Sequence, residues 1–269
     1  MNQIKTKEEI EKIRASCLLV CQGLALVGSM LKPGVTGKAI DSEVETLIRD
    51  HGAEPGFKGY RGFPNTLCIS VNDVVVHGIP NDDPIREIDI VSVDCGVLME
   101  GFYGDAAYTF ALTGVEEDVV ELIRVTKTSL KKGVEEAYAG HRIGDIGHAV
   151  QYYIEQKHHY SVVRELVGHG IGRNLHESPD VPNYGKRGRG VQLMEGMVLA
   201  LEPMVNLGHK EVVQNADGWT IKTKDGLPSA HFEHTLAIGA SKPDILSNHE
   251  LIEDQIKNNP YLKEISIKC

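Results

Sequence analysis

The sequence predicts an α+β protein in which helices precede strands in each half of the chain. Apolar residues recur at helical spacing from residue 7 to residue 31 and again over 116–157, and runs rich in β-branched residues follow each region. This order indicates two related α+β halves, although no internal repeat is visible in the sequence. No linker-like or low-complexity segment divides the chain, so we expect residues 1–269 to form a single domain.

Two helices are predicted at the start of the chain. Thr6 and Glu9 have the spacing of a capping box, and the apolar periodicity that follows ends before Pro33. A second helix is expected to follow Thr36, with one apolar face, and to end at Gly52.

The remaining elements are predicted from alternating and helical apolar patterns. Strands are expected at 66–76, at 88–111 and through much of 162–238. Further helices are expected at about 116–138, at 142–157 and, within a polar tail, near 248–257.

Composition restricts the class of partner and the compartment. The formal net charge of −10 disfavours nucleic acid as the main partner, because neutralising phosphates requires a basic face. No stretch approaches the roughly 18 apolar residues of a membrane span, and the start of the chain lacks the order of a secretory signal. We therefore expect a cytoplasmic protein that does not bind membranes.

The cysteines support the same compartment. Their spacing contains no CxxC pair and no regular framework, which argues against a structural zinc site or a disulfide scaffold. The five cysteines are Cys17, Cys21, Cys68, Cys95 and Cys269, and buried reduced thiols are expected at Cys17 and Cys21, which lie four apart on a predicted helix.

Two aspartates stand in strand-like apolar sequence, where a charged side chain would be buried and is therefore unusual. Asp94 ends the apolar run 90–93, and Asp105 precedes an alanine-rich strand. Gly96 and Gly101 lie between them and can turn the chain, so a hairpin would bring both carboxylates together. A buried carboxylate costs several kcal/mol unless it is paired or bound to a metal ion.

Three more residues of the second half belong to the same group. Glu202 interrupts an apolar strand, Glu233 lies within another, and His169 stands between Gly168 and Gly170, which allow close backbone approach. Four converging carboxylates would repel one another, whereas two divalent cations would balance their charge. Oxygen-rich sites with one imidazole suit Mn²⁺, Fe²⁺, Co²⁺ or Zn²⁺ alike.

Each of these residues has an ordinary structural explanation when it is taken alone. A single acid such as Asp94 is more often a cap, turn residue or ion-pair partner than a metal ligand. A single histidine such as His77 or His176 is usually structural. Spacing alone therefore does not establish that the side chains converge.

Longer motifs distinguish these explanations, because they occur together and in a fixed order. They are Tyr60-Arg61-Gly62-Phe63-Pro64, Cys68-Ile69-Ser70-Val71-Asn72, His77-Gly78-Ile79-Pro80, Gly168-His169-Gly170-Ile171-Gly172, Leu175-His176-Glu177, Glu202-Pro203, Asp217-Gly218-Trp219-Thr220 and Phe232-Glu233-His234-Thr235. With Asp94 and Asp105, this set resembles the type I methionine aminopeptidases of the short bacterial form, from about residue 5 to residue 250.

The resemblance implies the pita-bread fold, in which two halves related by a pseudo-twofold axis enclose a dinuclear metal site. It also implies two divalent ions, which the sequence leaves open as Co, Mn, Fe or Zn. The implied ligands are Asp94, Asp105, His169, Glu202 and Glu233, with Asp105 and Glu233 shared by both ions.

Roles for other residues also come from the resemblance. Glu202 is expected to move protons, His77 to contact the amino end of the substrate, and His176 to support the scissile carbonyl group. The methionine pocket is expected to contain Tyr60, Phe63, Cys68 and Trp219.

The chain departs from the common pattern of the family at three positions. Arg61 occupies a rim position where other members often have histidine or asparagine. Leu175 replaces a frequent phenylalanine, and His231 replaces the usual glutamine. These changes bear on the shape of the pocket and on hydrogen bonding around the ligands.

The implied activity is removal of the initiator methionine from nascent proteins whose second residue is small. We expect a monomer that meets the N-terminal peptide of these proteins near the ribosome. One alternative is an Xaa-Pro peptidase of the same fold, although such enzymes usually carry a separate N-terminal domain. The other is a binding module without activity, although such proteins generally lose ligands and this chain retains all five.

Overall fold

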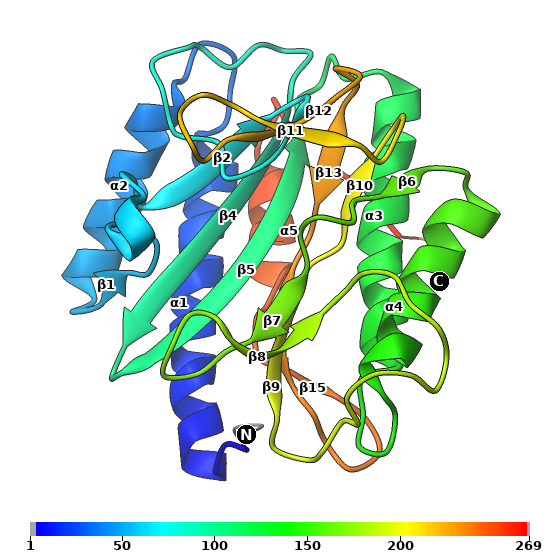
Figure 1. The fold of residues 1–269 in the computed structure, drawn as a ribbon. Coiled ribbons are helices and arrows are strands. Elements are labelled where there is room, and N and C mark those ends of the chain that lie inside the picture. Colours follow the sequence, from blue (N-terminus) through cyan, green and yellow to red (C-terminus); the bar gives the residue numbers. More distant parts are fainter. Residues whose placement is uncertain (1–3, 268–269) are drawn as a thin grey trace.

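The structure, a computed structural model, describes residues 4–267 and has the layout of the pita-bread fold (Figure 1). The first half contains α1 (Lys7–Met30), α2 (Gly37–Asp50), β1 (Glu54–Pro55), η1 (Tyr60–Gly62), β2 (Leu67–Val71), β3 (Val74–Val76), β4 (Ile90–Met99) and β5 (Phe102–Ala111). Cys269 and the first three residues of the chain lie outside the described residues.

The second half repeats the order of two helices followed by strands. It contains α3 (Glu117–Glu135), α4 (Ile143–Gln151), the π-helical turn η2 (Tyr152–Lys157), β6 (Ser161–Val162), β7 (Gly168–Gly170), β8 (Glu177–Val181), β9 (Val198–Leu201), β10 (Met204–Asn206), β11 (Val212–Gln214), β12 (Ile221–Thr223), β13 (Ser229–His231), β14 (His234–Ala237), β15 (Asp244–Ile245) and α5 (Glu250–Asn258).

Each half contributes one main antiparallel sheet, and the helices cover one side of both. β4 lies between β1 and β2 and also pairs with β5, whereas the second half has the order β15-β14-β9-β7-β8. In Figure 1, α1 runs behind β4 and β5, and α3 and α4 lie on the right, beside the strands of the second half. Two smaller sheets, β13-β10-β6 and β11-β12-β3, complete the strand layer.

The predicted hairpin between Asp94 and Asp105 is confirmed, and Gly101 turns the chain as expected, whereas the expectation that Gly96 also turns it was wrong. Asp94 does not end a strand, because β4 continues through Gly96 to Met99 and the chain reverses at Glu100 and Gly101. Both turn residues have positive φ, 50° and 79°, which a tight hairpin requires. Asp94 faces Ala107 and Gly96 faces Asp105, so the two carboxylates are diagonal neighbours on one face of the hairpin.

Three other boundaries differ from the prediction. The strand expected at 66–76 is divided at Asn72, which has φ 54° and turns the chain between β2 and β3. The strand expected from residue 88 begins at Ile90, because Asp89 instead accepts a hydrogen bond from the backbone N–H of Arg86 at 2.8 Å. The helix expected at 142–157 ends at Gln151 and continues as the π-helical turn.

Helix α1 corrects the expectation that no segment is apolar enough to span a membrane. By length and composition, one 18-residue stretch of α1 meets that requirement, and 61% of that stretch is buried inside the protein. Its apolar face packs on β4 and β5, which accounts for the composition of a core helix. The predicted capping box is present: the backbone N–H of Glu9 donates to the Thr6 hydroxyl, and the backbone N–H of Thr6 donates to the Glu9 carboxylate.

A short series of hydrogen bonds joins the two halves along β5. The Thr235 hydroxyl donates to the carbonyl oxygen of Asp105 at 2.7 Å. The backbone N–H of Glu233 donates to the carbonyl oxygen of Ala107 at 3.0 Å. Thr109 continues this seam through its hydroxyl, which donates to the carbonyl oxygen of His231 at 2.7 Å. The backbones that carry Asp105 and Glu233 are therefore fixed relative to each other.

Asn259, which follows α5, caps the C-terminal end of α1. The side-chain amide of Asn259 donates to the carbonyl oxygens of Gly28 and Leu31, each at 2.8 Å, and this side chain is buried. We predict that Asn259→Ala lowers the free energy of unfolding by about 1–3 kcal/mol, because two buried carbonyl groups lose their partner. Urea denaturation followed by circular dichroism measures this difference.

Asn258→Ala is the matched control, because its exposed amide donates only to Asp254 within α5. Equal stability of the Asn259 and Asn258 variants would contradict the capping role.

Candidate metal centre and active site

The side chains selected from the sequence surround one cavity of about 150 Å³ between the two halves. Its lining residues are Phe57, Tyr60, Arg61, Phe63, Cys68, His77, Asp94, Asp105, His169, Leu175, His176, Glu202, Trp219 and Glu233. Every residue expected to bind metal or substrate is therefore in one place, although the two aspartates come from one half and the other expected ligands from the second.

Strand pairing places the acidic and imidazole groups. Asp94 and Asp105 lie on the β4–β5 hairpin described above. In the second half, β9 pairs with both β7 and β14, so His169 on β7 lies next to Glu202, which follows β9. Glu233 immediately precedes β14 and reaches the same point from the other side.

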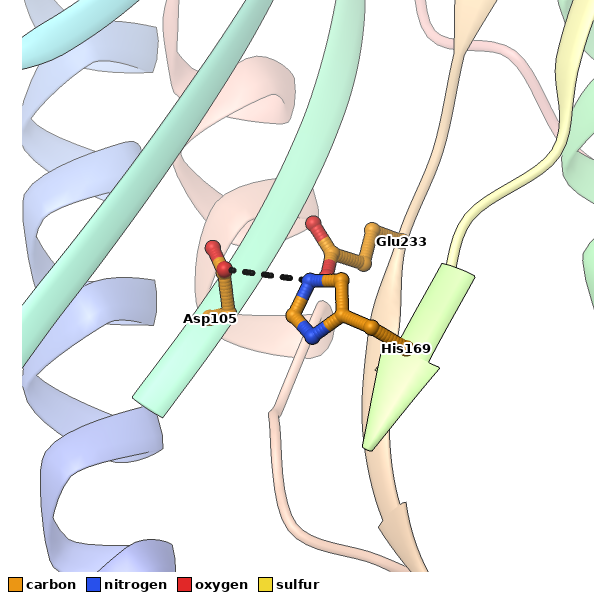
Figure 2. A group of neighbouring side chains, drawn as sticks. All are labelled: Asp105, His169 and Glu233. Atoms are coloured by element: carbon orange, nitrogen blue, oxygen red, sulfur yellow. Dashed lines mark ion pairs between the residues drawn. The ribbon is translucent and has the colours of Figure 1, made fainter. Parts of the chain in front are cut away.

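Three of these side chains form a tight group. Single ligand atoms of Asp105, His169 and Glu233 all lie within 4.8 Å of one another (Figure 2). The Nε2 atom of His169 is 3.9 Å from Asp105 Oδ2 and 3.6 Å from Glu202 Oε1. The Asp94 carboxyl group adjoins that of Asp105 and raises its pKa.

The backbone around His169 fixes which ring nitrogen faces the acids. The Nδ1–H group donates to the carbonyl oxygen of Gly170 at 2.9 Å, so Nε2 carries the free lone pair. A Cβ atom at Gly168 would lie 2.3 Å from the carbonyl oxygen of Ala200, and one at Gly170 would lie 2.5 Å from that of Ser178. The expectation of close backbone approach on both sides of His169 is confirmed.

Burial raises the pKa values of all four carboxyl groups, and repulsion by neighbouring carboxylates adds to the effect for Asp105, Glu202 and Glu233. Burial raises the pKa of Asp94 to about 7. The pKa of Asp105 lies well above its usual range because the group is buried and faces Glu233 and Asp94. Burial and the neighbouring carboxylates have the same effect on the pKa values of Glu202 and Glu233.

Burial acts in the opposite direction on the imidazoles. It lowers the pKa of His169 to about 3, with a smaller effect from His176, so the ring is neutral at physiological pH. The contact between His169 and Asp105 is therefore not an ion pair, and the cluster contains no cation of its own. A neutral imidazole is the form that binds a metal ion.

Unpartnered atoms show that the cluster fits divalent cations. Asp94 Oδ1, Asp105 Oδ1 and Glu233 Oε1 are buried without a hydrogen-bond partner. Unpaired buried oxygens destabilise a fold unless a cation or water contacts them. The donor set of carboxylate oxygens and one imidazole suits Mn²⁺, Fe²⁺, Co²⁺ and Zn²⁺.

An apolar slot adjoins the acidic cluster. Phe63 and Trp219 meet edge to face, with ring centroids 5.2 Å apart, and Cys68 is buried beside them. The turn before Trp219 is held by Asp217, whose carboxylate accepts from the Trp219 backbone N–H at 2.8 Å and from the Thr220 hydroxyl at 2.6 Å. The motif Asp217-Gly218-Trp219-Thr220 thus orients a wall of the slot.

The mouth of the cavity carries His176 and its neighbours. The Nδ1 atom of His176 and the Tyr60 hydroxyl are hydrogen-bonded at 3.0 Å, and the two rings stack. The Arg61 guanidinium group lies over the Tyr60 ring, 5.4 Å from its centroid. Burial lowers the pKa of His176, and the Arg61 charge lowers it further.

His77 lines the cavity, whereas His231 is buried beside Glu202. His77 has φ 57°, a conformation that is uncommon outside glycine and that is found at functional sites. His231 was noted only as an unusual residue, yet its Nε2 atom is buried, unpartnered and 3.7 Å from Glu202 Oε2. Burial lowers the pKa of His77 to about 4 and that of His231 to about 3, so both rings are neutral.

Sequence reasoning missed one cavity residue altogether. Phe57 lines the slot from an irregular segment between β1 and η1, where no periodic pattern marks a side chain as inward-facing. It packs against Gly96 of β4, where a Cβ atom would lie 2.5 Å from the Phe57 ring. That contact depends on tertiary structure and leaves no local signal.

Comparisons with known proteins agree with this geometry. The sequence model described as "Metallopeptidase family M24" matches residues 11–240. The methionine aminopeptidase of Clostridium perfringens is 48% identical over 244 residues, which cover 91% of this chain and 98% of that protein. The chain belongs to metallopeptidase family M24, among the methionine aminopeptidases.

Solved structures place the chain within this family in the same way. The crystal structure of methionine aminopeptidase from Rickettsia prowazekii superposes with a TM-score of 0.90 at 40% identity, covering 92% of this chain and all of that one. The prolidase from Pyrococcus furiosus has a TM-score of 0.75 at 24% identity, and the match covers 66% of its chain. This second likeness shows the pita-bread fold alone.

Protons and cations should compete for the carboxylate cluster. Metal binding must displace protons from groups whose pKa values are raised, including Asp94 at about 7. We predict that the apparent affinity of metal-stripped protein for Mn²⁺ rises by about tenfold per pH unit for each proton released, between pH 5.5 and 7. Isothermal titration calorimetry at several pH values measures the slope.

Asp94→Asn is the control for that slope, because it removes one titrating carboxyl group and should make the dependence shallower. An affinity that stays constant over this pH range would show that the carboxyl groups are not protonated before the metal binds.

Proposed function

We propose that this chain hydrolyses the first peptide bond of proteins and peptides that begin with methionine. The observation that carries the proposal is the apolar slot of Phe63, Cys68 and Trp219 placed directly beside a buried cluster of four carboxylates and one neutral imidazole. Membership of the methionine aminopeptidases supports the same reaction.

The proposed metal ligands are Asp94, Asp105, His169, Glu202 and Glu233. Their unpartnered oxygens and the free Nε2 of His169 support this assignment. Metal ions bound there would activate water for attack and polarise the carbonyl group of the substrate. A cluster of this kind would also attract the amino group of the substrate, which accounts for cleavage at the N-terminus only.

We assign the proton transfers to Glu202. Its carboxylate lies between two neutral imidazoles, His169 and His231, and burial and its acidic neighbours raise its pKa well above the usual range. A raised pKa brings a carboxyl group closer to the working pH of a general base. Glu202 would take a proton from water and return one to the leaving amine.

Two histidines that line the cavity would bind the reacting peptide group. We assign His176 to donate a hydrogen bond to the oxygen that gains charge during attack, and His77 to contact the substrate near its amino end. Tyr60 supports His176 through their hydrogen bond and ring stacking. A donor of this kind contributes about 2.7–4 kcal/mol to stabilising the transition state.

The slot accounts for the choice of side chain. An unbranched thioether fits between aromatic edges, and its burial contributes about 0.8 kcal/mol per methylene group. Branched side chains would be disfavoured by about 1–3 kcal/mol. We propose that the second residue must be small, because a bulky one would collide with the groups that surround the carboxylate cluster.

Several finer points belong to the same proposal. We propose that the substrates are nascent proteins, met near the ribosome by a cytoplasmic monomer, and that residues 1–269 form one catalytic domain. A core that extends from Leu19 to Leu262 across both halves supports the single domain. Free thiols at the described cysteines are typical of a reducing compartment. The metal is one of Mn, Fe, Co or Zn.

We predict that metal-stripped protein does not cleave Met-Gly-Met-Met and that adding Mn²⁺, Fe²⁺ or Co²⁺ restores release of the first methionine only. Glu202→Ala should abolish release with every metal, because it removes the base together with a ligand. His176→Ala should lower kcat by about 10²–10³ and leave Mn²⁺ binding unchanged. Chromatography of the products measures each rate.

Xaa-Pro peptides provide the comparison substrate. Faster cleavage of Xaa-Pro bonds than of Met-Gly-Met-Met would support the proline-directed alternative, and folded protein without Mn²⁺ binding would support a binding module.

A further inference from the structure

A buried ion pair joins the first described residues to the segment that carries His176. The ammonium group of Lys5 donates to Glu177 Oε2 at 2.6 Å, and each side chain is only 4% exposed. Burying two opposite charges adds little net stability, since each must lose its hydration. A pair buried to this extent next to His176 therefore points to a role in geometry.

Glu177 lies at the end of the loop that joins His169 to His176. Its backbone pairs with Gly170 where β8 meets β7, and its side-chain Oε1 accepts from the backbone N–H of Asn174 at 3.1 Å. Glu177 therefore contacts the loop at two points between His169 and His176, through its backbone at Gly170 and through its carboxylate at Asn174. Its second oxygen is the one that Lys5 holds.

Lys5 is held from its other sides as well. Its backbone N–H donates to the carbonyl oxygen of Gly196 at 2.8 Å. Its side chain lies against Gly172, where a Cβ atom would be 2.3 Å from Lys5 Cε and 2.7 Å from Nζ. The carbonyl oxygen of Gly172 in turn accepts from the backbone N–H of Tyr103 at 2.8 Å. The loop is therefore clamped between Lys5 and β5.

His176 depends on this loop for its position. The residue is exposed, its side chain is hydrogen-bonded to Tyr60, and its ring centroid lies 4.2 Å from that of His169. His169 is fixed separately, because β7 pairs with β9. Movement of the 170–177 loop would displace His176 and leave His169 in place.

We propose that Lys5 and Glu177 are positioning residues, whose ion pair holds the 170–177 loop so that His176 faces the reacting carbonyl group. The inference rests on the proposed function, because it assumes that His176 contacts the substrate. It assigns to the first described residues of the chain a direct influence on turnover.

Three substitutions test whether the Lys5–Glu177 ion pair, which we call the clamp, holds the 170–177 loop. Lys5→Met and Glu177→Gln each remove one charge, and Gly172→Ala inserts a methyl group where the Lys5 side chain lies. The backbone of Gly172 is outside the left-handed region, so alanine adds no backbone strain there and acts through its contact with the Lys5 side chain. We expect kcat on Met-Gly-Met-Met to fall by about 10-fold to 100-fold in each variant, as small displacements of a reacting group do.

KM and the Kd for Mn²⁺ distinguish a displaced His176 from general damage to the fold or to the site. KM and the Kd for Mn²⁺ should stay within about twofold of the parent values, because the slot and the carboxylate cluster lie on other elements. Lys5→Arg should restore most of kcat, since it keeps the charge. The double variant Lys5→Met/Glu177→Gln should be no slower than the slower single variant, because both act through one contact.

Glu155→Gln is the matched control. Glu155 forms a partly buried ion pair with Arg164 away from the cavity, so this variant loses the same kind of contact and should keep the parent kcat. Parent-like kcat in Lys5→Met, Glu177→Gln and Gly172→Ala would overturn the inference. A loss of kcat matched by equal weakening of Mn²⁺ binding would also overturn it.

A second readout does not depend on activity. Arg173 lies in the loop with 62% of its side chain exposed, so a loosened loop should be cut faster by trypsin after Arg173. We expect faster cleavage there in Lys5→Met and Gly172→Ala but not in Glu155→Gln. If the parent protein releases no methionine, the proposed function fails, whereas unchanged cleavage after Arg173 would reject the clamp itself.

Discussion

The burial of four carboxyl groups at one point between the halves is the constraint on which the rest of the structure depends. Asp105 and Glu233 are almost fully buried, and no cation among the described residues enters their cluster. Such a group is stable only if the carboxyls take up protons or bind cations. The seam along β5 keeps Asp105 and Glu233 together in spite of their repulsion, because it fixes their backbones rather than their side chains.

Strands and loops have different roles under this constraint. Strands hold the carboxylates, so their geometry is set when the sheets form. His176 and the residues around the mouth lie on loops, where positions must be secured one contact at a time. Tyr60, Asp217 and the Lys5–Glu177 pair are such contacts. Chemistry that needs fixed charge thus comes from the sheets, and substrate recognition comes from the loops.

Much of the fold and of the site could be predicted from the sequence. Polar residues inside apolar strands marked Asp94, Asp105, Glu202 and Glu233, because an isolated buried acid is unfavourable. Of the two glycines expected to turn the chain between Asp94 and Asp105, Gly101 does so, whereas Gly96 lies within β4 and makes room for the Phe57 ring.

Other features depend on contacts that no local pattern reveals. Phe57 faces the cavity from an irregular segment, and Lys5 meets Glu177 across 172 positions of sequence. The apolar length of α1 was underestimated for a related reason. Cysteine, glycine and serine separate its apolar residues, but tertiary packing buries that face of the helix all the same.

Counting the metal ions that the protein binds tests the central claim most directly. Equilibrium dialysis of metal-stripped protein against Mn²⁺, followed by elemental analysis, gives the number of ions per chain. The account predicts two ions in the parent protein and at most one in Asp105→Asn, because that carboxylate is expected to serve both ions. A folded parent that binds none, or an Asp105→Asn variant that binds as many as the parent, would contradict it.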